Sequence, residues 1–264
     1  MGFGLVAVDV DGTLLDDTLV LSEELVNWVR RLRTRGVEIT LATGRVFPSA
    51  AAVAQKLGVT APLITNGGAV VMTPAGFSIS CLALDPGEVR DILAFTSSCP
   101  GPRYLLTSRD ILSETGGDHA QSYARRLQVP VTIEPDLARV SGCGVTQVVL
   151  RVPPEQAERW EREGRTRFGS RLAVNRSLPW MVEFSHARAT KGQALSLLAG
   201  YLGIATPEVL AIGDGINDLD MLEAAGCGVL VGNAAPELWP RADFVTRSPH
   251  YRGVVEALER FFAH

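Results

Sequence analysis

Short hydrophobic runs that end in polar residues and glycines recur along the first third of the chain. The run at residues 3–8 shows no polar alternation, which is typical of a buried strand in a parallel sheet, and residues 37–42 are predicted to form a second apolar strand. After Ser22, a favoured N-cap residue, apolar residues three and four apart predict a helix, and a second helix is predicted at residues 46–57. Strands that alternate with helices in this way indicate an α/β fold.

The pattern changes near residue 83 and changes back near residue 186. Between these points, three helical patterns stand beside a few short strand-like pieces, a mixture typical of an α+β domain. We therefore predict a discontinuous α/β core, residues 1–83 and 186–264, interrupted by an inserted α+β domain at residues 84–185. The inserted helices are expected at residues 86–96, 118–127 and 154–168 and the strands at 104–106, 146–152, 172–175 and 181–184, whereas residues 125–135 and 140–145 fit neither pattern.

Two carboxylates follow directly after the first predicted strand. Asp9 and Asp11 stand where a buried parallel strand presents its functional residues. An unpaired charge is costly to bury, so these side chains are expected to meet a metal ion, a cation or solvent. Gly12 lets the backbone turn sharply there. The same residues also fit a common Asp-Gly turn, so the segment needs support from elsewhere in the chain.

Three further segments supply that support, at residues 41–45, 190–192 and 210–218. Taken singly, each has a structural explanation as a helix cap, a solvated lysine or a turn. For Lys191 that explanation is disfavoured, because a cation in the first turn of a helix opposes the helix dipole. Together with residues 9–13, and in this order, the segments resemble the four motifs of the haloacid dehalogenase (HAD) superfamily, in particular its Cof-type branch, subclass IIB.

The resemblance implies a Rossmann-like HAD core with a parallel sheet and an inserted α+β cap domain. The interval between Asp11 and Thr43 has room for one helix and one strand only. The large insert therefore follows the second motif, where the superfamily carries its second type of cap. Such a cap closes over the carboxyl edge of the sheet, contributes substrate contacts and excludes water.

Phosphoryl transfer needs a nucleophile, cations for the phosphate charge and a proton donor for the leaving oxygen. The resemblance implies that Asp9 is the nucleophile, forming an aspartyl-phosphate, and that Asp11 is first the general acid and then the base. Two carboxylates this close cannot both ionise easily, which favours one protonated member. The other implied roles are Mg²⁺ binding by Asp9, the Asp11 carbonyl and Asp214, support of that shell by Asp218, and phosphate binding by the Val10 and Gly12 amides, Thr43, Gly44, Lys191 and Asn217.

Two further polar residues, Arg45 and Asn66, lie at predicted strand ends. Each either contacts the leaving group of the substrate or braces the loops around it, and the sequence leaves both explanations open. A substrate-reading residue is also expected from the cap, but the sequence does not identify it.

Composition excludes several other classes of protein. The 264 residues carry a net charge of −4, which gives no general attraction to nucleic acid or anionic membranes. The first apolar run is far too short for a signal-peptide core or a membrane helix. Four scattered cysteines show no metal-binding spacing. We therefore expect a cytoplasmic protein. The resemblance implies that its partner is a small phosphorylated metabolite, and the oligomeric state is open.

The sequence thus predicts a Mg²⁺-dependent phosphatase acting on a sugar phosphate or a similar metabolite. A phosphomutase of the phosphomannomutase type and a non-catalytic binding module on a HAD scaffold are the alternatives. The resemblance also separates the chain from two other members of the superfamily. P-type ion pumps carry Lys at the position of Asp11, and haloalkanoate dehalogenation needs neither Asp11 nor the metal-binding set.

Overall fold

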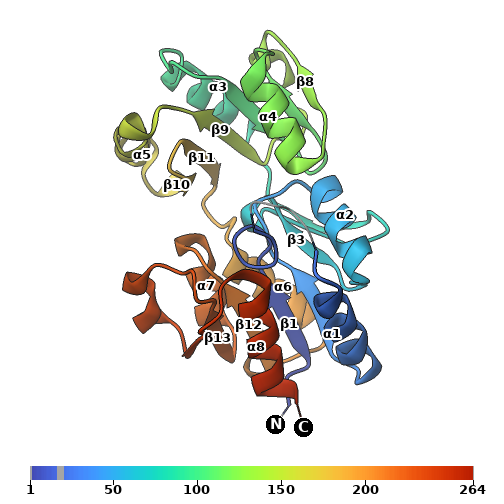
Figure 1. The fold of residues 1–264 in the computed structure, drawn as a ribbon. Coiled ribbons are helices and arrows are strands. Elements are labelled where there is room, and N and C mark those ends of the chain that lie inside the picture. The colour runs from blue at the N-terminus through green and yellow to red at the C-terminus, as the bar shows by residue number, and fades with distance from the viewer. Residues whose placement is uncertain (1, 17–20, 264) are drawn as a thin grey trace.

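The computed structural model describes residues 2–16 and 21–263, and these form two lobes (Figure 1). The lower lobe in this view carries both ends of the chain. At its centre, the described residues form a five-stranded sheet in the order β14-β13-β12-β1-β2, in which every neighbouring pair is parallel. These strands are β1 (Leu5–Val8), β2 (Glu38–Leu41), β12 (Val209–Gly213), β13 (Cys227–Leu230) and β14 (Phe244–Val245).

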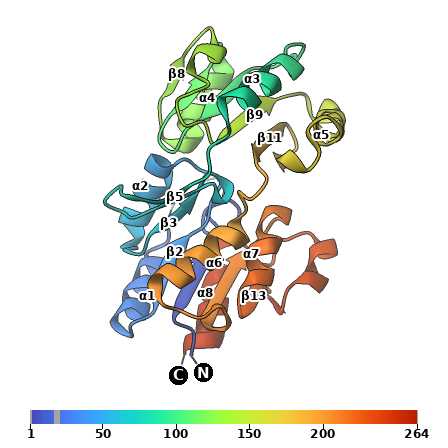
Figure 2. The ribbon, with the colours of Figure 1, turned by 180° about the vertical axis from the view of Figure 1, so that it is seen from behind.

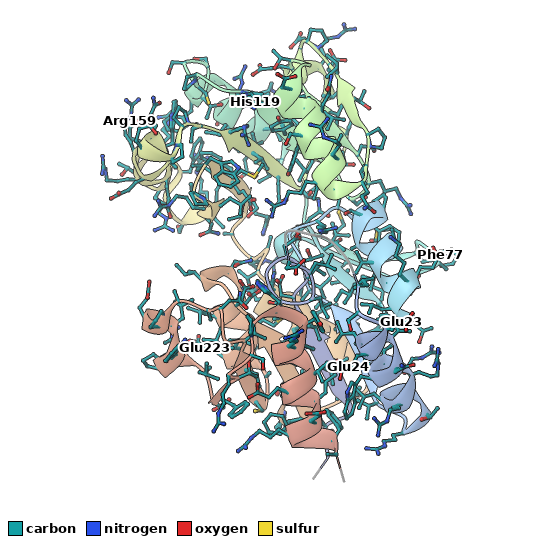
Figure 3. All side chains as sticks on the ribbon, viewed as in Figure 1. Glu23, Glu24, Phe77, His119, Arg159 and Glu223 are labelled. Carbon is teal, nitrogen blue, oxygen red and sulfur yellow. The ribbon has the colours of Figure 1, made fainter. Side chains whose placement is uncertain are left out.

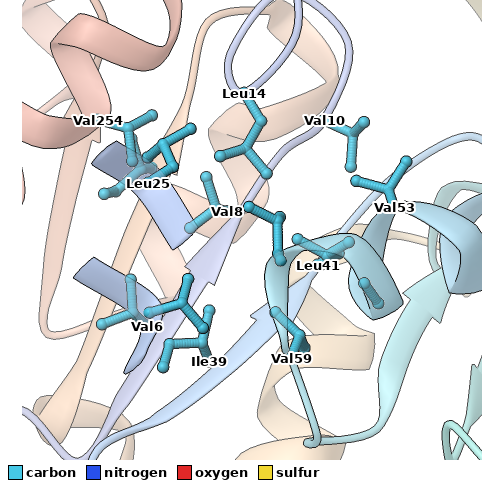
Figure 4. Close-up of a cluster of buried hydrophobic side chains, with 14 of the residues drawn as sticks. Val6, Val8, Val10, Leu14, Leu25, Ile39, Leu41, Val53, Val59 and Val254 are labelled. Atoms are coloured by element: carbon cyan, nitrogen blue, oxygen red, sulfur yellow. The ribbon is translucent and has the colours of Figure 1, made fainter. Parts of the chain in front are cut away.

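Helices cover both faces of this sheet, because its strands are apolar on both sides. In β1, Val6 and Val8 face one hydrophobic cluster (Figure 4), whereas Leu5 and Ala7 belong to a second cluster on the opposite face. Figures 1 and 2 show the helices of the first cluster on one side and those of the second behind it. The first set is α1 (Glu23–Thr34), α2 (Phe47–Leu57) and α8 (His250–Phe262), and the second is α6 (Lys191–Leu202) and α7 (Leu219–Ala224).

The predicted start of α1 is confirmed. The Ser22 hydroxyl accepts a hydrogen bond from the Glu24 amide at 3.2 Å, which satisfies one of the free amides at the helix N-terminus. Leu25, Val29 and Leu32 are buried as the spacing predicts, and Trp28 completes the face. The second predicted helix is α2.

A smaller sheet joins the core to the upper lobe. It contains β3 (Leu63–Thr65), β4 (Val70–Met72) and β5 (Ser78–Cys81), and each neighbouring pair is antiparallel. A single parallel bridge between Ala42 and Ile64 places β3 beside the end of β2. The carboxyl ends of β1, β2 and β3 therefore lie at one edge.

The upper lobe has a sheet of its own, in the order β10-β11-β9-β6-β7-β8 within the described residues. Helix α5 packs against β10 and β11, and Trp160 and Phe168 of that helix enter a separate hydrophobic cluster. The elements are α3 (Pro86–Phe95), β6 (Arg103–Leu106), β7 (Ile111–Ser113), α4 (Asp118–Leu127), β8 (Val131–Ile133), β9 (Gln147–Arg151), α5 (Pro154–Phe168), β10 (Leu172–Leu178) and β11 (Met181–His186).

Two of these strands, β7 and β8, were not predicted. Each has three residues, and β8 is largely exposed, so neither gives an apolar pattern that the sequence could reveal. The fold class itself is confirmed: a parallel α/β core carries an inserted α+β cap. Residues 84 and 185 stay our proposed limits of that cap. Six 3₁₀ helices connect the elements of the described chain: η1 (Asn66–Gly68), η2 (Leu137–Val140), η3 (Gly169–Arg171), η4 (Thr206–Glu208), η5 (Ile216–Asp218) and η6 (Pro236–Arg241).

A search of the described residues finds no helix that combines the length and the apolar character needed to cross a membrane.

Candidate active site

The polar residues singled out in the sequence meet at the carboxyl edge of the parallel sheet. Asp9 follows β1, Thr43 follows β2 and Asp214 follows β12, and these strands are neighbours in the sheet. Ligand sites of open α/β sheets lie outside this edge. Lys191, at the start of α6, joins them from the opposite direction.

Lys191 links two carboxylates. Its Nζ atom lies 2.6 Å from Asp9 Oδ1 and 2.6 Å from Asp218 Oδ1, and the side chain is only 2% exposed. The side chain of Thr190 caps the helix by accepting from the Gln193 amide. A cation in the first turn of a helix is unfavourable by itself, so the two carboxylates supply the charge that holds it there.

Asp218 is fully committed to its neighbours. While one carboxylate oxygen meets Lys191, the other accepts hydrogen bonds from the amides of Asp214, at 3.0 Å, and Gly215, at 2.9 Å. The residue is fully buried. Asp218 therefore fixes both the lysine and the loop that carries Asp214.

Asp214 is oriented by residues from both ends of the chain. The Thr13 hydroxyl donates to Asp214 Oδ1 at 2.8 Å, and Asn233 Nδ2 lies 3.3 Å from Oδ2. Asn233 also donates to the Gly12 carbonyl at 3.0 Å and accepts from the His250 amide at 2.8 Å. His250 Nδ1 lies 2.8 Å from the same carbonyl. No role was predicted for Asn233 or His250, although Asn233 stands just after a buried strand, a position that could have drawn attention to it.

Glycine is the one residue type that fits position 12. Its φ is +91°, and a Cβ atom built there would lie 2.4 Å from Asp214 Oδ2. The prediction that the Gly12 amide binds phosphate needs correction. In the structure that amide donates to the Leu15 carbonyl at 2.8 Å, because the loop folds back on itself. Gly12 instead permits the close approach of Asp214 and supplies a carbonyl to Asn233.

A Gly12→Ala variant should therefore lose activity because the added Cβ displaces Asp214. Its free energy of unfolding, measured by chemical denaturation, should fall by about 1–3 kcal/mol. Gly36→Ala is the matched control, since Gly36 has φ +77° but open space around the added Cβ. The control should show the cost of backbone strain without the loss of activity. Equal activity loss in both variants would show that the clash with Asp214 is unimportant.

Asp11 points away from Asp9 and toward two arginines. Arg45 donates to both of its carboxylate oxygens, from Nε and Nη2, each at 2.7 Å. This bidentate pair is buried on the arginine side, where 4% of Arg45 is exposed. The second arginine comes from the cap: Arg126 of α4 lies 3.8 Å from Asp11 Oδ1. The cap thus reaches the first motif directly.

These cations change the expected protonation of the two carboxylates. Burial raises the pKa of Asp9 well above its usual range, against the opposing effect of Lys191, and the Asp218 and Asp214 carboxylates raise it further. Burial acts the same way on Asp11, but the hydrogen bonds and charge of Arg45, aided by Arg126, bring its pKa below its usual range. Burial, the cations and the carboxylates of Asp214 and Asp218 set these shifts, so crowding between Asp9 and Asp11 is not their cause.

The remaining predicted residues divide into two groups. Gly44, Lys191 and Asn217 line a cavity of about 610 Å³ between the core and the cap. Asn66 does not: its amide donates to the Thr107 carbonyl and the Thr146 hydroxyl, both at 2.9 Å. Of its two explanations, the structure has Asn66 bracing the loops, in this case the connections into the cap.

The acidic cluster fits a divalent cation. Asp9, Asp214 and Asp218 each place an oxygen within 4.8 Å of the others. Three carboxylates with one lysine leave two negative charges in a buried setting, and burial raises the pKa of Asp214 as well. Hard oxygen ligands of this kind suit Mg²⁺. With Asp218 occupied by Lys191 and two amides, Asp9 and Asp214 are the residues of this cluster with oxygens to offer.

Fold and site together define a hydrolase with a parallel α/β core, an inserted cap and an acidic site at the edge of the sheet. The model of the haloacid dehalogenase-like hydrolase family matches residues 6–258, so the chain belongs to that family. In curated relatives from Bacillus subtilis, identity is 28% with the phosphatase YwpJ, over 97% of this chain and 98% of the relative, and 28% with 5-amino-6-(5-phospho-D-ribitylamino)uracil phosphatase YitU, over 98% and 97%. The solved structure of TM0651 from Thermotoga maritima has a TM-score of 0.85 at 30% identity, over 98% of this chain and 97% of that one. Two predictions are thereby confirmed: the family, and the enzyme class of a phosphoric monoester hydrolase.

Proposed function

We propose that this chain is a Mg²⁺-dependent phosphatase that hydrolyses a small phosphorylated metabolite, such as a sugar phosphate, through an aspartyl-phosphate on Asp9. The observation that carries the proposal is the buried Lys191, held at 2.6 Å from both Asp9 and Asp218 beside a cavity shared with the cap. Several relatives act as phosphatases, which supports the same activity.

Asp9 is the nucleophile in this proposal. Its carboxylate oxygen attacks the phosphorus atom, the bond from phosphorus to the leaving oxygen breaks, and an acyl phosphate forms. Water then attacks that phosphorus, the bond to Asp9 breaks, and inorganic phosphate leaves. Lys191 neutralises the Asp9 side chain and the bound phosphate. Thr43, Gly44, Asn217 and the Val10 amide complete the phosphate site.

Asp11 moves the protons. In the first step it gives a proton to the leaving oxygen, and in the second its carboxylate takes one from the attacking water. The ion pair with Arg45 stabilises the carboxylate, which is the form that the second step needs. The first step requires the Asp11 carboxyl to leave Arg45 and face Asp9. A rotation of this kind would couple the chemistry to the cap, because Arg126 contacts the same carboxylate.

Asp9, Asp214 and the Asp11 carbonyl would hold Mg²⁺, and Asp218 would keep their loops in place. When bound, the ion would offset the charge of the carboxylates and of the phosphate.

Chelation gives a direct test of this requirement. EDTA should abolish hydrolysis of an aryl phosphate, and excess Mg²⁺ should restore it, whereas Ca²⁺ should restore little because it prefers more ligands at longer distances. A matched experiment with Asp214→Asn should need a much higher Mg²⁺ concentration for half-maximal rate. Full activity in EDTA would overturn the metal assignment.

A phosphate-release assay over sugar phosphates, nucleotides, phosphoglycerates and phosphorylated cofactors tests the function itself. Release from at least one class, together with an aryl phosphate, is expected. Isomerisation of a hexose 1-phosphate without net phosphate release would favour a mutase. Tight binding without turnover of any compound would favour a binding module.

A further inference from the structure

The cavity extends from the proposed phosphate site to a charged cluster on the cap. At the core end it is lined by Gly44, Lys191 and Asn217, and at the cap end by residues of α5 and β10. Its volume of about 610 Å³ lies in the usual range of small-molecule sites. A bound substrate would therefore present its leaving group to the cap end.

Two arginines and one glutamate form the cluster at that end. Glu161 of α5 forms two ion pairs: its Oε1 lies 2.7 Å from Arg165 Nη2, and its Oε2 lies 2.7 Å from Arg176 Nε of β10. The glutamate is 14% exposed, and all three residues line the cavity. One carboxylate cannot neutralise two guanidinium groups, so these three residues keep one positive charge among them. Glu183 also lines the cavity, but its carboxylate accepts from the Ser177 hydroxyl and from Gln147 Nε2.

The donors of this cluster are only partly used. Arg165 Nε donates to the Val174 carbonyl at 2.9 Å, and Nη2 lies 3.5 Å from Asn175 Oδ1. In the part of the chain that the structure describes, no protein acceptor meets the two terminal amino groups of Arg176. A guanidinium edge with free donors matches the two oxygens of a carboxylate or a phosphate.

Strand register separates the cluster from Lys191 along the chain. Arg176 pairs with Val182 in the β10–β11 hairpin, and β11 runs from there to His186 before the chain reaches Lys191. Four residues of strand span about 13 Å. A ligand that meets both Arg176 and Lys191 must therefore carry its two anionic groups at separate ends.

We propose that Arg176, supported by Arg165 and Glu161, binds a second oxyanion at the end of the substrate remote from the reacting phosphate. The proposal rests on the proposed function and deepens it: the substrate class is a phosphorylated acid or a bisphosphate. Arg176 is a specificity-determining residue that recognises either a carboxylate or a phosphate. A neutral polyol would meet the same donors without the gain from opposite charge.

Matched substrate pairs test the proposal. In 6-phosphogluconate and sorbitol 6-phosphate, a carboxylate replaces a hydroxymethyl group at the far end, and fructose 1,6-bisphosphate and fructose 6-phosphate differ there by a phosphate. The wild type should show a higher kcat/KM for the member with two anionic groups in at least one pair. Arg176→Gln should reduce that preference by about tenfold, and Arg176→Lys by less. The pair that responds identifies the oxyanion.

Arg159→Gln is the matched control. Arg159 also lies on α5 and pairs with a glutamate, Glu163, at 3.1 Å, but it is exposed and points away from the cavity (Figure 3). It should leave the preference unchanged. Two results would overturn the proposal. One is a wild type that favours the members with a single anionic group, and the other is an Arg176→Gln variant in which kcat/KM falls equally for both members of a pair.

Failure of the proposed function remains distinguishable from failure of this inference. If no phosphate is released from any compound, the four compounds can be titrated calorimetrically against the wild type and Arg176→Gln. Tighter binding of the members with two anionic groups, lost in the variant, would support the oxyanion site by itself. Equal binding of all four compounds would overturn it.

Discussion

An Asp9→Asn variant will release no measurable phosphate from an aryl phosphate, a loss on the order of 10⁴-fold or more. The amide that replaces the carboxylate cannot attack phosphorus, and it offers a poorer ligand to Mg²⁺. A continuous assay of the released phenol measures the effect. Asp9 is 4% exposed, so no other carboxylate can take its place without rearranging the sheet edge.

The variant should nevertheless fold. Asn removes one of the three clustered carboxylates, and Lys191 keeps its contact with Asp218. A thermal melt within a few degrees of the wild type serves as the control. Turnover above about 1% of the wild type, in a variant that is folded and free of contaminating enzyme, would contradict the assignment of Asp9 as nucleophile.

The second large effect is expected from Lys191→Met. This change leaves the Asp9 and Asp218 carboxylates buried without their cation, and breaking a buried ion pair in this way costs about 3–5 kcal/mol. Chemical denaturation at neutral pH measures the loss, and phosphate release should fall below detection. Lys56→Met is the matched control, because Lys56 is exposed on α2 and is the other lysine of the chain.

The stability loss in Lys191→Met should depend on pH. Burial already raises the pKa of Asp9 in the wild type, and removal of the lysine raises it further. A carboxyl group with a raised pKa destabilises the fold while it is charged, so the difference between variant and wild type should shrink as pH falls. A difference that stays constant from neutral to acidic pH would show that lost packing, and not an unpaired charge, causes it.

Residues that follow buried strands were predictable from the sequence. The apolar runs before Asp9, Thr43 and Asp214 identify strands, and neighbouring parallel strands bring their carboxyl ends to one edge. The unfavourable position of Lys191 in the first turn of a helix pointed to nearby carboxylates. Both arguments depend on local patterns, which survive in any tertiary arrangement that keeps the elements.

Residues whose role depends on the tertiary arrangement were not predictable. Asn233 and His250 reach Gly12 from more than two hundred residues away, and Arg126 meets Asp11 only because α4 lies over the first motif. The use of the Gly12 amide by Leu15 depends on how one loop closes. No spacing in the sequence reports such contacts, and three-residue strands such as β7 give too short a signal.

The covalent intermediate on Asp9 is the central claim, and trapping it is the most direct test. Enzyme quenched in acid during turnover of a good substrate, then reduced with borohydride, should carry homoserine at position 9 in peptide mass spectrometry. The Asp9→Asn variant, treated in the same way, should carry no modification. Homoserine at another aspartate, or steady phosphate release with no modified peptide in quenched enzyme, would contradict the account.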